Sequence, residues 1–183
     1  HRRSGIAYLV DFNTVEIVKN LPRPRHIKSH LPLFLLPSQL WTVKPKVYYF
    51  KKKMLKKSFT NINFFQKIIY VARNPKDTAI SFYHHWRHIN GYTGTREDFL
   101  NAFLQDKALY SPQNEHVLGF WKIRNQKNVL FLFYEDMKRN LKNEIERTMK
   151  FLGKNYTNQQ IDCLCQHLSF DSMRKNSSCN YED

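Results

Sequence analysis

The feature that most limits the fold of this chain is a short apolar segment that runs straight into a charged turn. Residues 66–72 read Gln-Lys-Ile-Ile-Tyr-Val-Ala, and Arg-Asn-Pro follows at residues 73–75. A compact apolar run bounded by polar residues is typical of a fully buried parallel strand. Proline suits the first turn of a helix, and apolar residues then recur at helical spacing, so residues 76–88 are expected to be helical. The chain therefore places a strand, a tight turn and a helix in that order.

The remainder of the chain alternates in the same way between strand and helix patterns. Residues 128–134 form a second apolar run, Asn-Val-Leu-Phe-Leu-Phe-Tyr, and Gly153 suits the left-handed end of a helix. Further helices are expected to begin near residues 95 and 111 and to cover residues 140–152, 157–167 and 170–175. Residues 26–30 suggest a short strand, and residues 37–41 a short helix. Strands separated by helices predict an α/β fold built on a parallel sheet.

The composition fits one globular domain with a large positive charge. The 183 residues are 42% hydrophobic, and 30 Lys and Arg against 15 Asp and Glu give a formal charge of +15. Such a charge favours an anionic partner, whether a nucleic acid, an acidic membrane surface or a phosphorylated small molecule. No apolar run reaches the roughly 20 residues of a membrane span. Three cysteines without a secretory signal indicate a reducing, cytoplasmic setting.

One segment, residues 47–67, is more basic than the rest of the chain. It contains six lysines and no acidic residue: Lys51, Lys52, Lys53, Lys56, Lys57 and Lys67. Removing those six charges would lower the formal charge from +15 to +9. We expect this segment to be an atypical insert, and one hypothesis is a retained intron. The alternative is a basic arm that binds RNA or membranes, with Tyr and Phe interleaved among the lysines.

The junction that follows residue 72 has the groups that bind a phosphate. Arg73 lies at the carboxyl end of the predicted strand, and the free amides at the start of the next helix carry partial positive charge. Ser81 lies one to two turns into that helix, where its hydroxyl can reach the same anion. The alternative, from spacing alone, is that Arg73 pairs with Asp77 and that Ser81 only meets solvent.

Three segments of the chain resemble the cytosolic sulfotransferase family, in the order in which the family carries them. Residues 69–84, Ile-Tyr-Val-Ala-Arg-Asn-Pro-Lys-Asp-Thr-Ala-Ile-Ser-Phe-Tyr-His, are similar to the family's 3′-phosphate-binding segment. Residues 132–138, Leu-Phe-Tyr-Glu-Asp-Met-Lys, resemble its second nucleotide strand, and residues 167–173, His-Leu-Ser-Phe-Asp-Ser-Met, resemble its C-terminal nucleotide-contacting segment. The resemblance implies a P-loop nucleotide-kinase-like three-layer sandwich. It also implies the co-substrate 3′-phosphoadenosine 5′-phosphosulfate. No metal is expected, because the cluster of His84, His85 and His88 on one predicted helix supplies too few ligands without an acidic partner.

The resemblance further assigns roles to residues within the nucleotide-binding half, residues 68–173. The residues that carry over as cofactor-binding are Arg73, Ser81, Tyr134, Ser169, Phe170 and Met173. In the family the Arg and the first Ser hold the 3′-phosphate, and the Tyr contacts the adenine side. The last three residues form a further nucleotide-contacting group.

Further upstream, residues 24–33 resemble the acceptor-site stretch of the same family, which usually contains Lys-Thr-His-Leu-Pro. The match assigns the catalytic base to His30 and places Lys28 and Ser29 beside the acceptor. A neutral imidazole with an ordinary pKa of about 6.5 can take the proton of an acceptor hydroxyl as that oxygen attacks sulfur. Without the resemblance, a histidine in this setting is more often structural.

Two parts of the family pattern do not occur in these 183 residues. They are the phosphate-cradling Pro-Lys-Ser-Gly-Thr-Thr-Trp stretch and a C-terminal Arg-Lys-Gly segment. We therefore expect residues 1–183 to be a single partial domain, truncated at both ends, with an incomplete central sheet. The expected reaction is sulfuryl transfer to a small phenol, alcohol or amine, and dimerisation is left open. The alternatives are an inactive nucleotide-binding fragment and a basic protein that binds nucleic acid through residues 47–67.

Overall fold

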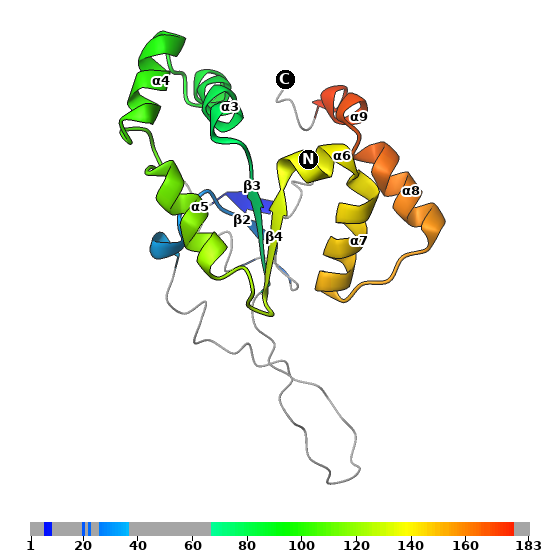
Figure 1. The fold of residues 1–183 in the computed structure, drawn as a ribbon. Coiled ribbons are helices and arrows are strands. Elements are labelled where there is room, and N and C mark those ends of the chain that lie inside the picture. The colour runs from blue at the N-terminus through cyan, green and yellow to red at the C-terminus, as the bar shows by residue number, and fades with distance from the viewer. Residues whose placement is uncertain (1–5, 9–19, 21, 23–25, 37–66, 178–183) are drawn as a thin grey trace.

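The computed structural model of the chain describes residues 6–8, 20, 22, 26–36 and 67–177 (Figure 1). The helix expected at residues 37–41 and nearly all of the basic segment lie outside these residues. Within them the architecture is a three-layer α/β sandwich, with helices on both sides of a parallel pair of strands (Figure 1). The predicted α/β class is therefore confirmed. No helix of the described ranges is long and apolar enough to cross a membrane.

The central strands are the two that the apolar runs predicted. Strand β3 covers Ile68–Ala72 and strand β4 covers Val129–Phe133. They pair in parallel, with Ile68 opposite Val129 and Ala72 opposite Phe133. Because parallel strands end at the same edge of a sheet, the residues that follow Ala72 and Phe133 lie side by side.

The prediction that β3 is fully buried is wrong for two of its side chains. Ala72 is 5% exposed, but Ile69 and Val71 are 40% and 45% exposed. These two alternate with Tyr70 and so lie together on one face of the strand. On that face the contacts of helices α6 (Tyr134–Arg139) and α7 (Leu141–Leu152) fall mainly on β4, which leaves β3 less covered.

Helices α3, α4 and α5 form the layer on the other side of the strands (Figure 1). They cover Pro75–Ile89, Arg96–Leu104 and Gln113–Lys122, close to the predicted positions. Thr95 caps α4 by accepting a hydrogen bond from the backbone N–H of Asp98. Helix α5 lies against the strands, where the Phe120 ring stacks on Tyr70 with a centroid distance of 4.1 Å.

Helices α6 to α9 form the third layer, and their ends follow standard capping chemistry. Helix α8 covers Asn158–His167 and begins with a capping box at Thr157, and α9 covers Phe170–Arg174. Helix α7 ends at Gly153, whose φ of 70° is left-handed as the glycine predicted. Helix α6 was not predicted, because its first residue, Tyr134, reads as the end of the preceding apolar run.

One lysine connects the start of β3 to the third layer. The ammonium of Lys67 donates a hydrogen bond to the backbone carbonyl of Phe151 and lies 5.4 Å from the centroid of the Phe151 ring. The last carbonyls of a helix carry partial negative charge, so a cation is favourable there. Lys67 therefore fixes the entry to β3 against the end of α7.

A smaller parallel pair lies near the layer of α5. Strand β1 covers Ile6–Tyr8 and strand β2 covers His26–Lys28, in agreement with the short strand predicted in this region. A 3-10 turn, η1, follows at Leu33–Leu35 and contacts α5. Pro32, between them, is fully buried. The segment that carries His30 is thus held between β2 and α5.

Candidate functional site

The structure brings together two residues that the sequence assigned to the nucleotide. Arg73 follows β3 and Tyr134 follows β4, and the register of the two strands sets them at one edge of the sheet. The guanidinium carbon of Arg73 lies 4.5 Å from the centroid of the Tyr134 ring, which is a cation–π contact. The Nε atom of Arg73 is buried and has no hydrogen-bond partner among the described residues. This guanidinium is therefore stacked on a ring, and its Nε atom lacks an acceptor among the described residues.

The alternative partner for Arg73, the Asp77 carboxylate, is not used. The ion pairs within the described residues join Arg139 to Asp136, Lys142 to Asp162 and Arg147 to Glu144. The acidic group near Arg73 is instead Glu135, which sequence reasoning missed. Its carboxylate accepts a hydrogen bond of 2.8 Å from the backbone N–H of Asn74. That bond, more than the nearby Arg73 charge, lowers the pKa of Glu135.

The amides at the start of α3 are less free than predicted. The Asn74 side chain accepts a hydrogen bond from the Lys76 N–H at 3.0 Å, and the Asn74 N–H is bound to Glu135. Pro75 has no N–H to offer. Binding of an anion at this junction therefore depends on the side chain of Arg73 more than on the helix amides.

Ser81 makes no hydrogen bond to Arg73, although the structure describes both residues. Its side chain is exposed in the second turn of α3, and no hydrogen bond joins it to Arg73 in the described part of the chain. Binding of one phosphate by both side chains therefore stays a prediction. In such a complex the phosphate itself would bridge the guanidinium of Arg73 and the hydroxyl of Ser81.

The third predicted group lies on α9, beyond the end of α6. Ser169 caps α9, and its hydroxyl accepts from the Ser172 N–H at 3.3 Å. The Phe170 ring is 60% exposed and has the ammonium of Lys138 at 4.4 Å from its centroid. Lys138 lies four residues after Tyr134, on the same side of α6, a spacing that could have identified it. Met173 is half-buried in the same short helix.

The predicted base, His30, lies among other rings. Its centroid is 5.8 Å from Tyr110 and 6.0 Å from His85. Burial is the main cause that lowers the pKa of His30, followed by the charge of Lys28 and by the neighbouring histidines His85 and His116. The imidazole is therefore kept neutral at a pH where an ordinary histidine would begin to protonate. Sequence reasoning missed these neighbours because they come from α3, α5 and the loop between α4 and α5.

The other two predicted acceptor-site residues are Ser29, which binds the backbone of the turn, and Lys28, whose charge acts on His30. The Ser29 hydroxyl accepts a hydrogen bond of 3.1 Å from the Leu31 N–H, which stabilises the turn after β2. Lys28 is the last residue of β2, and its charge acts on both His30 and His85. The structure thus places all three predicted residues in one segment, with the imidazole facing α3.

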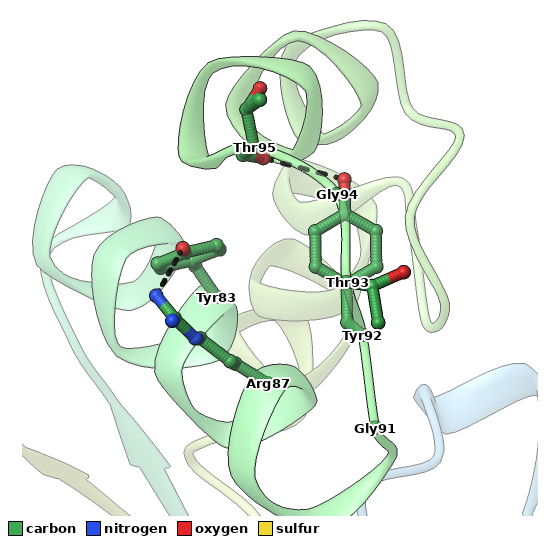
Figure 2. A pocket seen from close by; sticks show the side chains of 7 residues that line it. All are labelled: Tyr83, Arg87, Gly91, Tyr92, Thr93, Gly94 and Thr95. Carbon is green, nitrogen blue, oxygen red and sulfur yellow. Dashed lines mark hydrogen bonds between the residues drawn. The ribbon is translucent and has the colours of Figure 1, made fainter.

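A separate hollow lies at the far end of α3 from Arg73 (Figure 2). It has a volume of about 520 Å³ and is lined by Tyr83, Arg87 and residues 91–95. Arg87 donates a hydrogen bond of 3.3 Å to the Tyr83 hydroxyl, and Tyr92 donates one to the Thr95 carbonyl at 3.4 Å. A Cβ at Gly94 would lie too close to the Tyr92 hydroxyl, so the Tyr92 side chain would have to move to make room for it. None of these residues was predicted to act in function.

The His and Cys residues of the described ranges do not assemble into a metal site. No group of three or more His, Cys, Asp or Glu side chains in these ranges could hold an ion. The rings of His84 and His88 stack on each other at 6.4 Å, whereas His85 faces His30. Cys163 is exposed and Cys165 is half-buried, and both are free thiols.

Comparison with known proteins identifies relatives along most of the chain. The family model described as "Sulfotransferase domain" matches residues 49–183. Sulfotransferase 1A1 of Canis lupus familiaris is 38% identical over 169 residues, which are 91% of this chain and 50% of the dog protein. Luciferin sulfotransferase of Photinus pyralis is 37% identical over 171 residues, 93% of this chain and 41% of that protein. The chain spans about half the length of the curated relatives it matches.

Solved structures agree with these relatives. The crystal structure of mouse sulfotransferase SULT7A1 complexed with PAP has a TM-score of 0.75 and 30% identity, covering 98% of this chain and 60% of that one. Retinol dehydratase in complex with androsterone and the inactive cofactor PAP has a TM-score of 0.72 and 30% identity, covering 90% of this chain and 43% of that one. These matches confirm the predicted P-loop nucleotide-kinase-like class of the α/β sandwich.

Proposed function

Since this chain belongs to the sulfotransferase family, we propose that it binds the nucleotide of 3′-phosphoadenosine 5′-phosphosulfate and that the whole protein transfers the sulfuryl group to a small acceptor. The reacting acceptor group is a hydroxyl or amine, as in a phenol, an alcohol or an amine. The proposal covers the nucleotide-binding half at residues 68–173 and a cytoplasmic location. Two similar solved structures contain PAP, which supports the proposed class of nucleotide ligand.

The observation that carries the proposal is the state of Arg73. Its guanidinium is stacked on Tyr134, and its buried Nε has no acceptor among the described residues. A buried donor without a partner is unfavourable, and a phosphate oxygen would remove that penalty. A guanidinium suits a phosphate because its planar fork can donate two parallel hydrogen bonds. We assign the 3′-phosphate to Arg73 and the hydroxyl of Ser81.

The remaining nucleotide contacts follow from the same edge of the sheet. Tyr134 supports the adenine side, and the exposed ring of Phe170 offers a flat surface on which a base can stack. Ser169 and Met173 lie in the same short segment as Phe170 and complete this group. Helix α6 joins the two parts of the site, because Tyr134 and Lys138 are one turn apart on it.

His30 is the group we assign to the acceptor. Burial lowers the pKa of its imidazole and so favours the neutral ring, which can accept the proton of the acceptor hydroxyl while that oxygen forms a bond to sulfur. The bond between sulfur and the 5′-phosphate oxygen breaks in the same step, and 3′-phosphoadenosine 5′-phosphate leaves with the electron pair. Lys28 and Ser29 flank the acceptor. No metal is part of this proposal.

The test is a calorimetric titration of the 183-residue chain with 3′-phosphoadenosine 5′-phosphate. Arg73→Ala is expected to weaken binding by about 10- to 100-fold, as loss of a charge-assisted contact does. The matched control is Arg139→Ala, because Arg139 is an exposed arginine on α6 that pairs with Asp136. Equal affinity of Arg73→Ala and the intact chain would contradict the proposal.

The same titration separates the nucleotide from other anions. Adenosine 5′-phosphate lacks the 3′-phosphate, so Arg73→Ala should leave its affinity within about twofold. A basic protein that binds nucleic acid through residues 47–67 would instead bind RNA and lose that binding when residues 51–57 are deleted. An inactive nucleotide-binding fragment would bind the nucleotide but turn over no phenol.

A further inference from the structure

His116, on α5, connects the segment of His30 to the central sheet. Its Nε2 atom lies 3.1 Å from the backbone carbonyl oxygen of His30, which is 86 positions away in the sequence. Its Nδ1 atom lies 2.9 Å from the hydroxyl of Tyr70, in the middle of β3. Both contacts are partly buried. One imidazole therefore spans the distance between the predicted acceptor segment and the strand that leads to Arg73.

The partners of the ring fix where its proton is. A carbonyl oxygen can only accept a hydrogen bond, so Nε2 of His116 carries the hydrogen. In a neutral ring Nδ1 is then an acceptor, and the Tyr70 hydroxyl donates to it. Burial raises the pKa of Tyr70 to about 12, so the phenol keeps its proton at neutral pH. The result is a directed chain of two hydrogen bonds from Tyr70 to His116 to the carbonyl of His30.

The packing of aromatic rings supports these two hydrogen bonds. Phe120, one turn after His116 on α5, stacks on Tyr70 at 4.1 Å and lies 5.8 Å from His116. The backbone of His30 is therefore held from one side. Its imidazole faces His85 and Tyr110 and is not tied by a hydrogen bond to any side chain of the described residues. The arrangement fixes the position of the residue and leaves the ring nitrogens available.

We propose that His116 is a positioning residue that sets His30 at a fixed distance from the nucleotide site. Tyr70 is three residues before Arg73 in the same strand segment, so the two hydrogen bonds relate the base to the phosphate-binding edge. This inference rests on the proposed function of His30. An attacking oxygen, a base and a sulfuryl donor must align for transfer, and small misplacements lower the rate strongly.

Two substitutions of similar polarity separate the contacts of His116. In His116→Gln the amide nitrogen reaches the place of Nε2 and can still donate to the His30 carbonyl. In His116→Asn the shorter amide reaches the place of Nδ1, so it keeps a partner for Tyr70 and loses His30. Thermal unfolding of both variants, compared with the intact chain, shows how far each one stays folded.

The first readout is the NMR signal of the His30 imidazole in the 183-residue chain, assigned with His30→Gln. We expect His116→Gln to preserve its chemical shift and pH titration, and His116→Asn to change both. Identical His30 signals in the two variants would overturn the proposal. This readout needs no turnover, so it decides the positioning role even if the chain transfers no sulfuryl group.

The second readout is the rate of sulfuryl transfer to a small phenol. We expect kcat to fall by about 10- to 100-fold in His116→Asn and to stay within about threefold in His116→Gln, with the affinity for 3′-phosphoadenosine 5′-phosphate unchanged in both. Equal kcat values in two equally stable variants would contradict a positioning role. A chain that neither binds the nucleotide nor turns over would instead contradict the proposed function.

Discussion

At the scale of single residues, the cation–π contact between Arg73 and Tyr134 makes the proposed site more than a charged surface. A free arginine side chain loses conformational freedom when it binds a phosphate. Arg73 has already lost much of that freedom, because the Tyr134 ring lies 4.5 Å from its guanidinium carbon. The ring therefore contributes to binding without touching the phosphate.

Substitution of Tyr134 tests this contribution. Tyr134→Leu removes the ring face and is expected to weaken binding of 3′-phosphoadenosine 5′-phosphate by about 3- to 10-fold, whereas Tyr134→Phe keeps the ring and most of the affinity. Calorimetric titration measures both. Tyr156→Leu is the control, because Tyr156 is 45% exposed in the loop before α8. A Phe variant as weak as the Leu variant would show that the ring face is not what matters.

The lowered pKa of His30 sets the direction of its pH dependence. Since burial and the charge of Lys28 disfavour the protonated ring, the rate should fall only below pH 6.5, the ordinary histidine value. In Lys28→Met one of these causes is gone, so the pKa measured by NMR should move up toward 6.5. Lys150→Met, on α7, is the control.

The same lowered pKa affects the stability of the fold. Because His30 binds its proton at a higher pH in the unfolded chain than in the folded chain, the free energy of unfolding decreases as the pH falls through 6.5.

At the scale of elements, the helix ends that have a local capping residue lie within one residue of the predicted ends. Thr95, Asn140 and Thr157 cap their helices with side-chain hydrogen bonds, and Gly153 ends α7 in the left-handed region. These features depend on residues within one turn of each other, so the sequence alone specifies them. Helix α6 was missed because its start is set by the end of β4 and not by a local cap.

Two glycine substitutions test whether the backbone conformation at each position decides the effect, because they are expected to change the free energy of unfolding in opposite directions. Gly153→Ala places a Cβ at a φ of 70° and is expected to lower the free energy of unfolding by about 1 kcal/mol. Gly119→Ala lies inside α5, where its Cβ would only touch Leu33, and is expected to raise that free energy by about 0.5 kcal/mol. Urea unfolding measures both. The same sign for the two variants would contradict the argument.

At the scale of the whole molecule, sequence reasoning gave the layers but not the environment of the site. Arg73 and Tyr134 each follow one of the two apolar runs, so their contact was accessible from the pattern of strands once the two runs pair in parallel. The ring cluster around His30 was not, because His85, Tyr110 and His116 meet it only through tertiary packing. The exposure of Ile69 and Val71 also depends on which helices cover which strand, and no local pattern contains that information.

Deletion of residues 51–57 tests whether the basic segment belongs to the nucleotide site. The deletion removes five lysines and no acidic residue, so the formal charge falls from +15 to +10. Since none of the residues assigned to the nucleotide belongs to residues 51–57, affinity for 3′-phosphoadenosine 5′-phosphate should stay within about twofold at physiological salt, which screens the general attraction of a basic chain for an anion. Calorimetry at two salt concentrations measures this. A large loss of nucleotide binding would place the lysines in the site.

The contact of Lys67 with the last turn of α7 ties the start of the central strands to the third layer. Because this ammonium is bound at Phe151, the pairing of β3 with β4 begins beside a fixed point on that helix. Arg73 and Tyr134 follow the other ends of the same two strands. The end of α7 is therefore one of the supports on which the position of the Arg73 guanidinium depends.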